Sequence, residues 1–199
     1  MYQPEHFRVN DPEEAWSFLE ANSFGWLISL GGSRLQATPL PFLLSADRRF
    51  LRAHLARQNP QWHELDEAEV LVSFLGPHAY VSPSWYTQPG VPTWNYSALQ
   101  VRGTCRLFHD SGRLELLVRE LTDKHEARLP SPWQAAPPGS KLKSIVGLEV
   151  QVDEIECKYK LNQNRSKAEQ SEVARRLEEL GSTEVAQAMR RSLDSQAGD

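Results

Sequence analysis

The pattern of apolar and polar residues predicts a run of strands with helices at both ends of the chain. A helix over about 12–22 is expected first, because Asp11 caps it and Glu14 completes a capping box. Short apolar or alternating segments then indicate about six strands. These strands are expected at Phe24–Leu30, Leu35–Leu44, Phe50–Leu55, Val70–Leu75 with Ala79–Val81, Tyr96–Phe108 and Gly147–Ile155. A further helix is expected over 113–125, followed by a proline-rich connector over 130–138.

The second strand and the end of the chain carry local signals of their own. Pro39 and Pro41 cannot donate ladder hydrogen bonds, so their strand must be an edge strand or contain a bulge. Ser166 begins a second capping box, and apolar positions keep helical spacing until Gly181 ends the helix. Ser182 then caps another helix, so the chain should end in a helical hairpin.

This order of elements predicts an α+β protein built on a small antiparallel barrel. A length of 199 residues is enough for one domain with an appendage or for two small domains. We expect a barrel domain over 1–165 and a helical hairpin over 166–199.

Charge and composition exclude some classes of protein. Lys and Arg total 22 against 26 Asp and Glu, a net charge of -4, which argues against a general nucleic-acid or membrane coat. A local patch of basic residues is still compatible with this net charge.

The cysteines and the first residues bear on location. Cys105 and Cys157 lie far apart and outside any zinc-binding pattern, so two buried thiols in a reducing cytoplasm are expected. The acidic, proline-broken start lacks the basic and apolar regions of a signal peptide, and the longest apolar runs are too short to span a bilayer. The sequence thus predicts a soluble, cytoplasmic protein without a membrane partner.

Six tryptophan and tyrosine residues lie in the range from Gln61 to Tyr96, several of them in or near a Pro/Gly-rich loop at 83–92. They are Trp62, Tyr80, Trp85, Tyr86, Trp94 and Tyr96. A planar ligand, a subunit interface or an ordinary core would each bury them.

Two segments could bind an anion. His54 and Arg57 precede a helix start at Asn59-Pro60, where a guanidinium and backbone N–H groups suit a phosphate. The alternative is an exposed arginine beside a capped helix. The second segment, 158–165, has three cationic residues and three amides, which suit an anion. The alternative is a solvated linker.

Signals for catalysis and DNA reading are weak. No nucleophile elbow, P-loop, zinc-protease or dinucleotide-binding motif occurs, and the histidines are scattered. The C-terminal hairpin has loose spacing and acidic residues in its second helix, so it does not read as a helix-turn-helix.

Three blocks of sequence resemble the PaiB family. They are Gly76-Pro77-His78-Ala79-Tyr80-Val81-Ser82-Pro83-Ser84-Trp85-Tyr86, Val91-Pro92-Thr93-Trp94-Asn95-Tyr96 and Lys158-Tyr159-Lys160-Leu161-Asn162-Gln163-Asn164-Arg165-Ser166. The opening residues and the segment 53–62 match as well, so the resemblance runs from residue 1 to about 180. It implies a bacterial FMN-binding split β-barrel similar to the pyridoxamine-phosphate-oxidase group, and a homodimer with FMN between subunits.

The resemblance also implies a set of cofactor-binding residues. Arg57 is the expected phosphate contact, with His54 and Asn59 beside it, and the strand at Thr38 and Pro39 should lie along the flavin ring. The remaining FMN contacts, from the same or the partner subunit, are expected at Trp94, Asn95, Lys160, Gln163 and Asn164. Family members often have Asn-His where this chain has Thr38-Pro39, so ring contacts there should differ.

The resemblance leaves three functions open. Family members are described as negative transcriptional regulators, which implies a flavin or redox sensor with DNA as a partner, although no DNA-reading module occurs in this sequence. The alternatives are a flavin-dependent oxidoreductase or flavin reductase using NAD(P)H, and a flavin-free scaffold.

Overall fold

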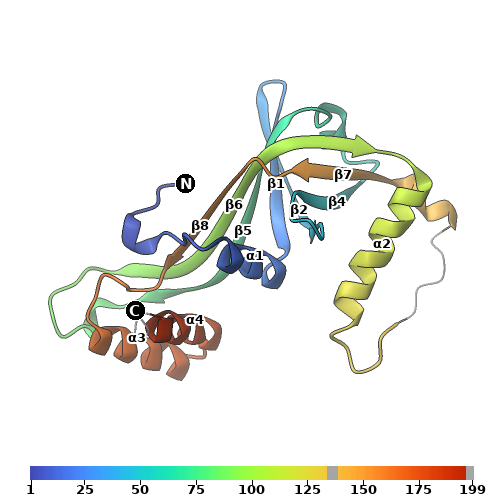
Figure 1. The fold of residues 1–199 in the computed structure, drawn as a ribbon. Helices are drawn as coiled ribbons and strands as arrows, with labels where there is room; N and C mark the ends of the chain where they lie inside the picture. The colour runs from blue at the N-terminus through green and yellow to red at the C-terminus, as the bar shows by residue number, and fades with distance from the viewer. Residues whose placement is uncertain (134–138, 196–199) are drawn as a thin grey trace. The chain divides into compact units, whose positions relative to one another are not determined.

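The computed structural model describes residues 1–133 and 139–195, which contain eight strands and four α-helices (Figure 1). The strands are β1 Phe24–Gly31, β2 Arg34–Pro41, β3 Leu43–Leu44, β4 Phe50–Ala56, β5 Glu69–Val81, β6 Thr93–Phe108, β7 Ile145–Gln151 and β8 Glu154–Lys160. The helices are α1 Pro12–Ala21, α2 Ser111–Glu126, α3 Lys167–Glu179 and α4 Thr183–Ser195. Short 3-10 helices are η1 Glu5–Phe7, η2 Pro60–Glu64, η3 Pro83–Trp85 and η4 Gly139–Ser144.

Two strands that the sequence predicts as continuous are each divided. The strand expected over 35–44 becomes β2 and β3, because Phe42 turns into the core and its N–H bonds the carbonyl of Ser23 at 2.8 Å. The strand expected over 147–155 becomes β7 and the start of β8. Eight strands therefore replace the predicted six, and residues 134–138 of the predicted connector lie outside the described residues.

The chain divides into two compact units. The hairpin unit consists of 1–18, 75–99 and 156–199, of which the structure describes 156–195. The barrel unit consists of 19–74 and 100–155, so the long strands β5 and β6 each contribute to both. Helices α3 and α4 belong to the hairpin unit, and a separately folding hairpin beginning at residue 166 stays a prediction.

The sheet has the strand order β2-β1-β5-β6-β7-β4-β3, and β8 pairs with β6. Neighbouring strands in the barrel unit are antiparallel, with Trp26 opposite both Pro39 on β2 and Ser73 on β5. At the other end of the order β7 pairs with both β6 and β4. This confirms the predicted α+β class and the antiparallel barrel. It also confirms that the proline-containing strand is an edge strand, since β2 lies at the end of the order.

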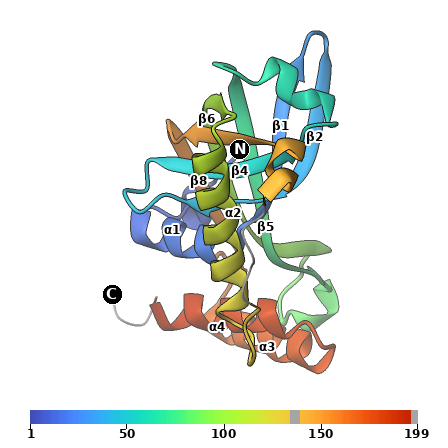
Figure 2. The same cartoon turned by 90° about the vertical axis from the view of Figure 1, so that its right-hand side faces the viewer.

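Helix α2 packs on the barrel unit against β7 and η4 (Figure 2). The carboxylate of Asp110 caps it by accepting from the N–H of Arg113 at 2.8 Å. Its apolar face buries Leu114, Leu117 and Leu121 against Phe108 and other residues of one cluster. The start of α2 is thereby held next to the end of β6.

In the hairpin unit α3 and α4 lie side by side and cover β5 (Figure 1). Their buried positions pack with Ala79 and Val81 of β5. The predicted cap is present, since the Ser166 hydroxyl accepts from the N–H of Glu169, and Gly181 ends α3 with a φ of +81°. The helical hairpin is therefore confirmed for residues 166–195.

Both cysteines are buried free thiols, as the sequence predicts. Burial, with a smaller contribution from Asp66, raises the pKa of Cys105 to about 12, and burial near Glu14 does the same for Cys157. Both thiols therefore stay protonated at neutral pH. Within 1–133 and 139–195, no helix is long and apolar enough to cross a bilayer.

Candidate functional site

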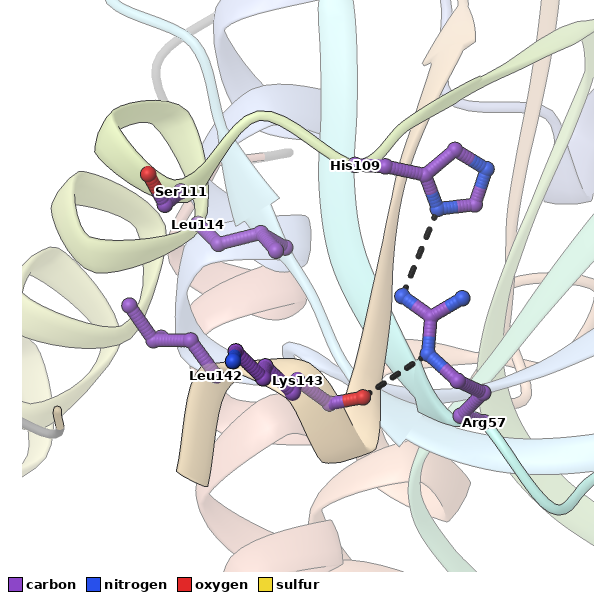
Figure 3. Close-up of a pocket in the computed structure, with 6 residues that line it drawn as sticks. All are labelled: Arg57, His109, Ser111, Leu114, Leu142 and Lys143. Carbon is purple, nitrogen blue, oxygen red and sulfur yellow. Dashed lines mark hydrogen bonds between the residues drawn. The ribbon is translucent and has the colours of Figure 1, made fainter. Parts of the chain in front are cut away.

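A cavity of about 280 Å³ opens in the barrel unit beside the first turn of α2 (Figure 3). It is lined by Arg57, His109, Ser111, Leu114, Leu142 and Lys143. Arg57 directly follows β4, His109 connects β6 to α2, and Lys143 belongs to η4. Three separate segments of the chain therefore meet at this cavity.

The Arg57 guanidinium anchors the chain around the cavity. Its Nε donates to the carbonyl of Lys143 at 2.8 Å, and its Nη2 donates to the carbonyl of Ile145 at 2.9 Å. Nη2 also lies 3.5 Å from Nδ1 of His109 (Figure 3). The Trp62 indole packs 5.9 Å from the guanidinium and donates to the Arg57 carbonyl at 2.9 Å. Arg57 is thus a structural residue as well as a cation in the cavity.

The donor set around this cavity suits a phosphate group. Nη1 of Arg57 and the ammonium of Lys143 make no hydrogen bond within the part of the chain that the structure describes, and Ser111 adds a hydroxyl. No carboxylate is among the six described residues that line the cavity, and the nearby Asp110 is occupied in capping α2. The phosphate end of FMN therefore fits these residues.

Sequence reasoning named Arg57 but missed His109, Ser111 and Lys143. His109 was visible as one of several scattered histidines, and Lys143 as one of two lysines after the proline-rich connector. The sequence around these residues does not distinguish them from ordinary solvent-exposed residues. They line the cavity because η4 packs next to the end of β4 in the folded chain.

A partly buried hydrogen-bond network holds Thr38 and Asn59 together. Asn59 Nδ2 donates to the Thr38 hydroxyl at 3.0 Å, and that hydroxyl donates to Oε1 of Gln61 at 2.5 Å. Gln61, which is 1% exposed, also donates to Ser29 Oγ and to the Leu27 carbonyl. Thr38 and Asn59 therefore use these hydrogen bonds to hold the barrel together. A ligand would contact only those of their polar atoms that are not already bonded. Gln61 was not predicted, because its partners come from distant strands.

Pro39 lies on the opposite, outward face of β2, across from Trp26. Large apolar side chains cover this face of β1 and β2. Their exposed fractions are 65% for Phe24, 50% for Trp26, 60% for Leu30 and 78% for Leu35. Exposed apolar side chains that gather on one face of a sheet are typical of interaction surfaces.

His54 lies on β4 opposite Gly147, with its Nδ1 buried and without a hydrogen-bond partner among the described residues. Burial lowers the pKa of His54 below its ordinary value of 6.5. The imidazole is therefore neutral in the folded protein near pH 7. His54 is close to Arg57 in sequence, but no hydrogen bond joins the two side chains among the described residues.

The stability of the protein should depend on pH through His54. Since the folded pKa is lowered, the unfolded chain binds more protons below about pH 6.5, and the free energy of unfolding falls as the pH falls. We expect the His54→Gln variant to lose less unfolding free energy than the wild type between pH 7 and pH 5. Urea unfolding followed at several pH values measures this, with the exposed His125→Gln as the matched control. Parallel curves for His54→Gln and wild type would contradict the assignment.

The other five predicted cofactor residues belong to the hairpin unit. Trp94 is 53% exposed, and Asn164 is exposed. Lys160 lies at the end of β8, so the segment 158–165 begins in a strand and is not a linker. Asn95 is fully buried and donates to the Met189 sulfur at 3.2 Å, so a ligand cannot reach it in this structure. Gln163 bonds its own chain, donating to the Tyr159 carbonyl and accepting from the N–H of Leu161.

Comparisons with known proteins find one matching family and several relatives of similar sequence. The family described as "Putative FMN-binding domain" matches residues 1–154. Protease synthase and sporulation protein PAI 2 of Bacillus subtilis (strain 168) is 38% identical over 186 residues, which cover 89% of this chain and 89% of that protein. Uncharacterized protein AN0679 of Emericella nidulans is 33% identical and covers 74% of this chain and 76% of its own length, so the relatives extend beyond bacteria.

A solved structure supports the fold independently of sequence. The FAD and heme binding protein from Mycobacterium smegmatis superimposes with a TM-score of 0.64 at 16% identity, covering 82% of this chain and 78% of that chain. At this identity the likeness concerns the split-barrel fold alone. Since the family match spans most of the chain and the Bacillus relative aligns over nearly its whole length, this chain belongs to the PaiB-type family of FMN-binding split-barrel proteins.

Proposed function

We propose that this protein is an FMN-binding homodimer that acts as a flavin-responsive regulator. The observation that carries the proposal is the cavity beside α2, where Arg57 and Lys143 present cationic donors and none of the six described lining residues is acidic. FMN carries about two negative charges on its phosphate near neutral pH. In an acidic protein such a ligand needs a local basic site of this kind. Bound FMN would supply reversible electron transfer.

Particular residues would hold the two ends of the cofactor. Arg57, Lys143 and Ser111 would bind the phosphate oxygens, and the edge strand at Thr38 and Pro39 would flank the ring. His54 and Asn59 stay predicted contacts between these two ends. Asn95 and Gln163 are left out, because the first is buried and the second is bonded to its own backbone.

The outward face of β1 and β2 supports the homodimer. Phe24, Trp26, Leu30 and Leu35 are at least half exposed on adjacent, paired strands. Covering such a face with a second copy removes apolar surface from water, which is the main driving force for association. A twofold contact between identical faces satisfies both copies at once.

The regulatory role rests on the relative and not on a DNA-binding surface. The Bacillus relative is named for protease synthase and sporulation. In the hairpin unit Arg175 and Arg190 pair with glutamates of α3, so these two arginines offer DNA little free positive charge. We therefore propose that flavin occupancy is passed on through protein contacts.

Titration with FMN and riboflavin tests the proposal, because the two share a ring and differ in the phosphate. We expect one FMN per chain and an affinity for riboflavin that is lower by about a hundredfold, followed by flavin absorbance and fluorescence. Sedimentation should show a dimer that the Trp26→Glu variant dissociates.

Other outcomes would change the proposal. Equal affinity for both flavins would mean that the cavity does not bind the phosphate. A lack of affinity for either flavin would refute FMN binding. A wild-type monomer would refute the dimer. NADPH oxidation that is faster with protein than with free FMN would replace the regulator with a flavin reductase.

A further inference from the structure

Three ring side chains cluster on one exposed face of the hairpin unit. His78 and Tyr80 extend from β5, and Trp94 extends from β6. The Trp94 ring lies 6.2 Å from the His78 ring at an interplanar angle of 32°, and 6.3 Å from the Tyr80 ring at 72°. Trp94 is 53% exposed and Tyr80 is 46% exposed. These rings therefore contact each other and still present free faces to solvent.

Lys160 places a cation beside this cluster. Its Nζ donates to the Trp94 carbonyl at 2.6 Å and also to the Thr93 hydroxyl. An ammonium has three donors, so one is left for a ligand. Lys160 is half-buried, and this burial, followed by the neighbouring charge of Lys158, lowers its pKa. We call His78, Tyr80, Trp94 and Lys160 the Trp94 surface.

Neighbouring parts of the same sheet are already covered. Ala79 and Val81 face the helices α3 and α4. The ammonium of Lys158 is enclosed by the rings of Tyr2 and Tyr96 at 5.7 Å and 5.3 Å, and it donates to the Tyr2 carbonyl. The Trp94 surface has no such cover from the described residues.

We propose that the Trp94 surface binds a small planar aromatic acid. The ring of the ligand would stack on Trp94 between His78 and Tyr80, and its acidic group would bind the free donor of Lys160. Stacking supplies affinity without a strict demand on ring identity, whereas the fixed ammonium selects for a negative charge.

The chemistry of the surface favours an aromatic acid over the flavin ring. An isoalloxazine presents several donors and acceptors along one edge, and these need matching polar groups. Of the three amides expected as cofactor contacts, Asn95 is buried, Gln163 is bonded within its own chain and Asn164 is exposed. The Trp94 surface itself consists of ring faces and one cation. The proposal concerns a second ligand and does not depend on FMN binding.

Calorimetric titration with 2-naphthalenesulfonate, and with 2-naphthalenemethanol as its neutral analogue, tests the proposal. We expect the sulfonate to bind at least tenfold more tightly than the alcohol. Trp94→Leu should weaken both ligands at least tenfold. Lys160→Gln should abolish the preference for the sulfonate, and Lys160→Arg should restore it. Trp133→Leu removes an indole that is 63% exposed in the barrel unit, and it should leave both affinities unchanged.

Three results would overturn the proposal. The first is equal binding of the probes to wild type and Trp94→Leu. The second is displacement of the probe by one equivalent of FMN, which would assign the surface to the flavin. The third is a change of oligomeric state in Trp94→Leu without ligand, which would make the surface a subunit interface. Failure of FMN to bind, with probe binding retained, would refute only the proposed function.

Discussion

Replacing Arg57 by alanine is expected to weaken FMN binding by about tenfold to a hundredfold, because charge-assisted hydrogen bonds to a phosphate contribute about 1.5–3 kcal/mol. The same change removes the donors to the carbonyls of Lys143 and Ile145. We therefore also expect the free energy of unfolding to fall by about 2 kcal/mol. Flavin titration and urea unfolding of the same preparation measure both effects.

Two comparisons separate binding from folding in this experiment. Riboflavin has no phosphate, so its affinity should hardly change in Arg57→Ala. The matched control is Arg106→Ala, which removes an exposed arginine of the barrel unit that pairs with Glu67. That variant should keep both FMN affinity and stability, since exposed ion pairs contribute little. An equal loss of FMN and riboflavin affinity would mean that Arg57 acts only through the fold.

Gly103→Ala should destabilise the protein strongly, although it adds only one methyl group. A Cβ at position 103 would lie 1.7 Å from the backbone carbonyl oxygen of Gln151 and 2.9 Å from its carbon. Because the clash is with backbone, no side-chain rotation relieves it, and β6 and β7 must separate. We expect a loss of about 3 kcal/mol or more, which lowers Tm by roughly 6–12 °C in a chain of this length.

The matched control for this variant is Gly112→Ala in the first turn of α2. There the new Cβ would meet one atom at 3.3 Å, the Oδ1 of Asp110. Alanine favours a helix over glycine by up to about 1 kcal/mol, so stability should be kept or slightly raised. Calorimetry of both variants gives the comparison. A Tm of Gly103→Ala within about 2 °C of wild type would show that the strands part more easily than the close approach implies.

Local signals account for the elements that sequence reasoning predicted well. The hairpin of α3 and α4 follows from Ser166, Gly181 and Ser182, which act on backbone groups within a few residues of themselves. The edge position of β2 follows from Pro39 in the same way, because a missing N–H is a property of the residue. Such signals need no knowledge of the rest of the chain.

The divided strands show where local reasoning stops. Phe42 continues an apolar run and reads as part of a strand, yet it leaves the ladder to fill the core. Asn95 reads as an exposed amide in an aromatic loop, yet it extends β6 on the face that meets Met189. In both cases packing decided the outcome, because burying a ring or covering a helix outweighs the preference of a single residue.

The residues of the cavity also differ in how far the sequence alone could identify them. Arg57 could be named from its type and its place before Asn59-Pro60, but its partners Lys143 and Ile145 lie 86 and 88 positions further on. Residue types thus settled the order of helices and strands, the edge strand, the net charge and the family. The convergence of Arg57, His109 and Lys143 came from the register between β4 and β7. That register is set by burying alternate side chains of both strands in one core, which only the folded chain can do.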